Sequence, residues 1–113
     1  MNKQEFYTFL DDRKQSVLAD IQTLSAEGRT DDANILKAKF NVYDIARSVF
    51  DASAKQSGDT APTAFPVLFG KITGSWSTSL ETAKAHEDDR KVLIEEAKLA
   101  AVAEINAKVA EFI

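Results

Sequence analysis

The fold of this chain is decided by the stretch Leu24-Ser25-Ala26-Glu27-Gly28-Arg29-Thr30-Asp31-Asp32-Ala33. Gly28 suits the left-handed backbone position just past a helix end, where a side chain would clash. Thr30 can cap a following helix with its hydroxyl, and Asp31 and Asp32 complement the positive end of that helix's dipole. Because so short a connection makes the two flanking helices antiparallel, the stretch predicts an N-terminal αα-hairpin.

The composition is typical of one small helical domain. The chain has 113 residues, of which 44% are hydrophobic and 28% charged, with four glycines, two prolines and no cysteine. This length suits a single core, so residues 1–113 are expected to form one domain. Few turn-forming residues argue against a sheet of many short strands, and the missing cysteines exclude disulfides and thiolate sites. We therefore expect an all-α helical bundle.

The two helices of the hairpin differ in their hydrophobic pattern. Residues 3–27 carry one apolar stripe and one polar face, as expected for a helix at the edge of a bundle. Residues 31–56 are apolar around most of the helical wheel, and Phe40 and Val42 point to different sides. A helix of the second kind needs packing partners on two sides, which predicts that it lies at the centre of the bundle.

The middle of the chain holds the remaining helix-breaking residues. The stretch 57–63, which contains Gly58 and Pro62, is expected to be a loop. Phe65, Leu68, Phe69 and Ile72 then suggest a short helix, and Gly70 and Gly74 predict that it bends or breaks.

The last third of the chain contains no glycine or proline. Residues 75–113 keep one apolar stripe in helical phase, which favours a long C-terminal helix. The segment 84–91 loses its apolar residues, so the alternative is an up-down four-helix bundle with a turn near residues 87–89. We favour the continuous helix, because a turn without glycine, proline or asparagine is unusual.

Residues with catalytic chemistry form no recognisable site. His86 is the single histidine and lies in the charged segment His86-Glu87-Asp88-Asp89-Arg90, which is typical of a solvated helix face. Adjacent acids such as Asp31 and Asp32 point about 100° apart on a helix, so they cannot face one metal ion together. We therefore predict no catalytic, cofactor-binding or metal-binding residues and no cofactor.

The overall charge narrows the range of partners. The formal net charge is −4 and the isoelectric point about 4.9, which counts against nucleic-acid binding. No signal peptide and no apolar stretch long enough to span a bilayer is visible, so we expect a cytoplasmic protein that does not contact membranes.

These observations favour a non-catalytic protein–protein interaction or assembly module that forms a homodimer. A continuous C-terminal helix would outrun the hairpin and expose apolar residues, which a second copy would cover. The expected interaction surface contains Trp76, Leu99, Val102, Val109, Phe112 and Ile113. Two alternatives are a small all-α Mg²⁺-dependent enzyme acting on a nucleotide-like substrate, and a regulator with a local nucleic-acid-binding patch.

Overall fold

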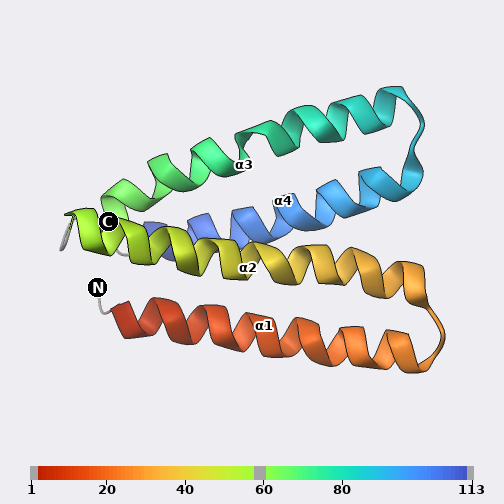
Figure 1. Cartoon of the computed structure of the whole chain (residues 1–113), viewed down its shortest axis with the longest axis horizontal. Helices are drawn as coiled ribbons and strands as arrows, with labels where there is room; N and C mark the ends of the chain where they lie inside the picture. Colours follow the sequence, from red (N-terminus) through yellow and green to blue (C-terminus); the bar gives the residue numbers. More distant parts are fainter. Residues whose placement is uncertain (1–2, 58–60, 112–113) are drawn as a thin grey trace.

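Four helices run alternately up and down the molecule. A computed structural model describes residues 3–57 and 61–111. Its helices are α1 (Lys3–Ala26), α2 (Thr30–Ser57), α3 (Ala61–Ala85) and α4 (Asp89–Ala110) (Figure 1). Both termini lie at one end of the bundle, and the tips of the two hairpins diverge at the other end. The prediction of an all-α helical bundle is confirmed.

The first hairpin has the predicted glycine turn. Gly28 has φ 76°, and its N–H donates to the carbonyl of Ser25 at 3.1 Å. The N–H of Arg29 donates to the carbonyl of Leu24 at 2.9 Å. Together these two bonds form a Schellman motif, which satisfies carbonyl groups at the end of α1. Thr30 is the first residue of α2, so the helix begins one residue earlier than expected.

The prediction of one long C-terminal helix is wrong, and the alternative, a turn near residues 87–89, is confirmed. The N–H of Glu87 donates to the carbonyl of Lys84 at 3.1 Å, and that of Asp88 to the carbonyl of Ala83 at 2.9 Å. This repeats the hydrogen bonds of the first turn, with Glu87 at φ 54° in the place of the glycine. Asp88 then caps α4 by accepting from the backbone N–H of Lys91 at 3.2 Å.

The short, broken helix predicted after the connector is also wrong. α3 is continuous from Ala61 to Ala85 and includes Pro66, Gly70 and Gly74. Its inner face holds Phe65 and Phe69, which are 0% and 1% exposed. Burial of two phenylalanines contributes several kcal/mol, which exceeds the roughly 1 kcal/mol by which each glycine weakens a helix. The predicted loop 57–63 lies partly outside the described residues.

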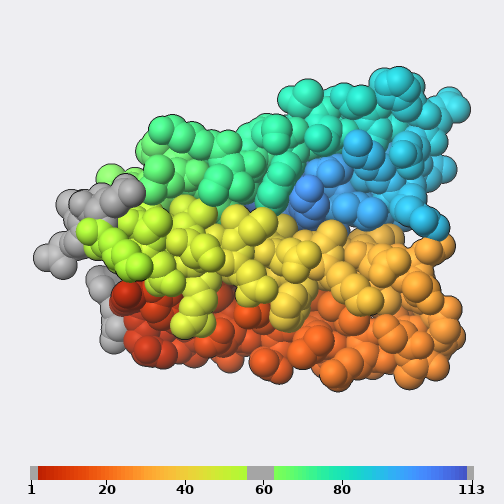
Figure 2. Space-filling view, in the orientation of Figure 1, coloured from red at the N-terminus to blue at the C-terminus, as the bar shows by residue number. Residues whose placement is uncertain are grey.

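α2 is the central helix, as its apolar pattern predicted. It packs against α1, α3 and α4, whereas the backbones of α1 and α4 do not pack closely. Val42 is 1% exposed, and Phe40 on another side of α2 is partly buried. In the space-filling view α2 meets α3 over the half of the molecule nearest the termini, and α4 becomes visible between them toward the hairpin tips (Figure 2).

An aromatic cluster joins three helices at the end of the bundle that carries the termini. The ring centroid of Phe6 in α1 lies 4.6 Å from that of Phe50 in α2 and 5.6 Å from that of Phe65 in α3. Phe69 stacks on Phe65 at 4.9 Å. Because aromatic pairs at these separations add to the stabilisation from burial, this cluster fixes the hairpins to each other.

Candidate interaction surfaces

The residues predicted to form an interaction surface are divided between the surface and the core. Trp76, Leu99 and Val102 are partly buried. Val109 is 0% exposed and belongs to the core of the single chain. Phe112 and Ile113 lie outside the described residues. Of the four predicted residues that the structure describes, Val109 is therefore not available on a surface.

Trp76 takes part in a small polar arrangement beside a shallow hollow. The ammonium of Lys98 lies 4.3 Å from the Trp76 ring centroid and 3.2 Å from Oε1 of Glu95. Glu95 is 6% exposed, and its Oε2 has no hydrogen-bond partner among the described residues. The hollow of about 280 Å³ lies between α2, α3 and α4, with Trp76 and Lys98 in its wall. Since Lys98 already contacts the carboxylate and the ring, this arrangement holds α4 against α3.

A second polar cluster connects α1, α2 and α4. The hydroxyl of Tyr43 donates to Oε2 of Glu104 at 2.6 Å. Arg13 and Lys39 approach the same carboxylate at 3.8 and 3.7 Å. Burial of Tyr43, followed by its hydrogen bond to Glu104, raises the pKa of the phenol well above its ordinary value. A phenol that stays protonated in this way is suited to a structural hydrogen bond.

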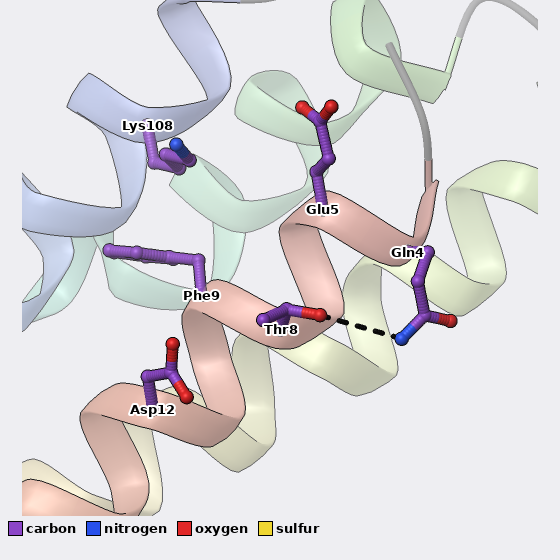
Figure 3. Close-up of a pocket in the computed structure, with 6 residues that line it drawn as sticks. All are labelled: Gln4, Glu5, Thr8, Phe9, Asp12 and Lys108. Carbon is purple, nitrogen blue, oxygen red and sulfur yellow. Dashed lines mark hydrogen bonds between the residues drawn. The ribbon is translucent and has the colours of Figure 1, made fainter.

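The open side of the bundle is a groove between α1 and α4, named here the α1/α4 groove. It has a volume of about 400 Å³ and is lined by Gln4, Glu5, Thr8, Phe9, Asp12 and Lys108 (Figure 3). Phe9 points toward Lys108, whose ammonium lies 5.8 Å from the ring centroid. Glu5 points into the space between the two helices. The groove exists because α1 packs against α2 and not closely against α4.

The α1/α4 groove was not predicted from the sequence. Glu5, Phe9 and Asp12 follow one another at i, i+4 and i+7, so they share one side of a helix. This spacing is the signal that was available in the sequence. Whether the side faces solvent or a neighbouring helix depends on how α1 sits on α2.

A third surface is the outward side of the α3–α4 hairpin, named here the hairpin face. Its exposed residues recur at one-turn spacing on each helix, and most of them are small and uncharged. On α3 they are Thr63, Val67, Gly70, Gly74 and Ser77, and on α4 Leu93, Ala100, Ala103, Ala107 and Ala110. Val67 and Leu93 are 62% and 52% exposed. Val67 lies near the start of α3 and Leu93 near the start of α4, so the small residues of the hairpin face connect two large apolar side chains at opposite ends of the hairpin.

Charge separates the hairpin face from the rest of the surface. Between Ala61 and Leu80, α3 carries Lys71 as its one charged residue, and the exposed charged residues of α4 that share the one-turn spacing of Leu93 are Asp89 and Glu96. Acidic and basic side chains, in contrast, are spread along the whole length of α1 and α2. The hairpin face therefore differs from its surroundings in charge as well as in side-chain size.

The acidic residues and the histidine of the described part of the chain form no metal-binding cluster. Among the described residues no group of three or more His, Asp or Glu side chains could hold a metal ion. His86 is exposed just past the end of α3, where its backbone N–H donates to the carbonyl of Thr82 at 3.0 Å. Within residues 3–57 and 61–111, no helix combines the length and apolar character needed to cross a bilayer.

Comparisons with known proteins assign no family to the chain. No protein-family model matches the chain, and neither the curated proteins nor the solved structures compared with it gave a match.

Proposed function

We propose that this protein is a non-catalytic assembly module that forms a homodimer through the hairpin face. The observation that carries the proposal is the hairpin face itself, whose named residues are uncharged, mostly small, and include the exposed Val67 and Leu93. Such a surface forms few hydrogen bonds with water, and covering it removes apolar area from solvent.

A second copy is the partner that this surface favours. Each copy carries a net charge of −4, so two copies repel one another when charged faces meet. The hairpin face reduces this repulsion, because its named residues carry no charge. Glycine and alanine also allow a close approach of helices, because they leave little side-chain bulk between the two backbones.

The size of the hairpin face fits a dimer interface. Two helices about 33 Å long and about 10 Å wide present roughly 650 Å². A standard interface buries about 800 Å² on each partner. The earlier reason for a dimer, an over-long C-terminal helix, no longer applies because the chain folds back after Ala85. The present proposal rests on the exposed residues of both helices of the hairpin.

The experiment is a mass measurement by light scattering coupled to size exclusion, from micromolar to near-millimolar concentration. We expect the wild-type mass to rise toward twice 12.4 kDa. Ala103→Glu places a charge at the middle of α4 and should keep the protein monomeric. Ala19→Glu is the matched control, since Ala19 is an exposed alanine of α1 outside the hairpin face. Circular dichroism checks that both variants remain helical.

A wild-type mass of 12.4 kDa at every concentration contradicts the proposal. Equal loss of association in Ala103→Glu and Ala19→Glu also contradicts it, because the hairpin face would then have no special part. The Mg²⁺-dependent enzyme, the nucleic-acid-binding regulator and the cytoplasmic location stay predictions from the sequence.

A further inference from the structure

The α1/α4 groove is a space between two helices in which a further helix could lie. α1 and α4 run antiparallel in the bundle, and each packs against α2. The space between them is about 400 Å³ where Phe9 faces Lys108. An additional helix laid along this groove would contact α1 and α4 on its two sides, as neighbouring helices do in a closed bundle.

Phe9 supplies the apolar centre of the groove. Its side chain is partly buried against the core, and the rest of the ring lines the groove. The guanidinium of Arg13 lies 5.9 Å from the ring centroid, close to the 5.8 Å of Lys108. Because Phe9 is only partly buried, a leucine-sized side chain from a partner that rests on the part of the ring not covered by these two cations would remove that surface from water.

Carboxylates lie on both sides of Phe9 along α1. Glu5 and Asp12 are exposed, and neither takes part in an ion pair or hydrogen bond with another described residue. Seven residues of helix separate them, which is two turns or about 10.5 Å. A helix with two basic side chains seven residues apart, and an apolar one between them, presents the complementary pattern at the same spacing.

We infer that the α1/α4 groove binds a basic amphipathic helix of a partner protein, with one apolar side chain on Phe9 and basic side chains at Glu5 and Asp12. The net charge of −4 adds a long-range attraction for such a segment. The same carboxylates disfavour a nucleic acid, because they would face its phosphates. This inference is independent of the homodimer, since the groove and the hairpin face lie on different helix surfaces.

The probe is a fluorescein-labelled, alanine-based helical peptide with Arg, Leu and Arg at positions i, i+4 and i+7. Its binding to the full-length protein is followed by fluorescence anisotropy at low ionic strength. The double variant Glu5→Gln/Asp12→Asn should weaken binding by roughly fivefold to tenfold, the loss expected for two exposed ion pairs. Added salt should weaken wild-type binding, because it screens exposed charges.

Asp20→Asn is the matched control, since Asp20 is an exposed acid of α1 outside the groove. It should change the affinity by less than about twofold. A second peptide with Glu in place of both Arg residues should not bind. The inference is overturned if both peptides bind alike, or if Asp20→Asn weakens binding as much as the double variant does.

Two further measurements distinguish peptide binding in the α1/α4 groove from dimerisation through the hairpin face. Ala103→Glu, which should be monomeric, is expected to bind the peptide with wild-type affinity. Thr8→Arg places a cation between Glu5 and Asp12, on an exposed position of the groove wall, and should reduce binding at least fivefold at low salt. Wild-type affinity in Thr8→Arg would show that the peptide binds elsewhere.

Discussion

Replacement of Glu87 by glycine should stabilise the protein. Glu87 has φ 54°, a conformation that costs an ordinary residue about 1–2 kcal/mol and glycine almost nothing. The side chain is exposed and forms no ion pair or hydrogen bond with another described residue, so its removal sacrifices no contact. Glycine also makes the unfolded chain more flexible, which offsets about 0.4–1 kcal/mol of the gain.

The expected net change is therefore a stabilisation of roughly 0.5–1 kcal/mol. For 113 residues this corresponds to a rise in melting temperature of about 2–4 °C, from the usual entropy of unfolding per residue. The assay is urea unfolding followed by circular dichroism at the helix minimum, with the free energy taken by linear extrapolation. An unchanged slope would show that the unfolded state is comparable in the two proteins.

Ala85→Gly, two residues earlier, is the control for this prediction. Ala85 is the last residue of α3 and is exposed, so glycine there should destabilise the protein by about 0.5–1 kcal/mol. The two substitutions are expected to have opposite signs. If Glu87→Gly destabilises the protein as much as Ala85→Gly does, residue 87 does not occupy the left-handed position and the turn has another geometry.

Two further predictions follow from the turns and the buried phenol. Gly28→Val should lower the free energy of unfolding by about 1–2 kcal/mol; no atom within 4 Å would meet an added Cβ, so the cost lies in the backbone, and an unchanged urea midpoint would contradict this. Tyr43 has a raised pKa in the folded protein, so its contribution to stability is complete below pH ~10, the ordinary phenol pKa, and is lost as the pH rises toward the raised value. Urea midpoints at several alkaline pH values should therefore fall more steeply for the wild type than for Tyr43→Phe, and parallel curves would show that Tyr43 does not titrate in this way.

The local sequence was sufficient to predict those elements whose sequence signals lie within a few residues of one another. Gly28 identified the first turn because the left-handed position there has a residue well suited to it. The apolar pattern of residues 31–56 identified the central helix, since two sides of that helix needed a partner. Both inferences depend on backbone preference and periodicity, which can be read without knowing what lies nearby in space.

Tertiary structure decided the features in which packing outweighs local preference. Glu87 occupies a position for which glycine is preferred, because the turn there lets α3 and α4 pack against each other and against α2. α3 stays continuous through Gly70 and Gly74, because Phe65 and Phe69 on its inner face are buried. In both places, burial of apolar surface over many residues outweighs local costs of about 1–2 kcal/mol per residue.

The same division applies to the candidate surfaces. The helical spacing of Ala100, Ala103, Ala107 and Ala110 can be read from the sequence, but the continuation of this surface onto α3 required the hairpin. The spacing of Glu5, Phe9 and Asp12 was visible too, whereas the groove beside them was not. That groove depends on α1 packing against α2 and leaving α4 apart, and no local sequence signal specifies the distance between two helices separated by most of the chain.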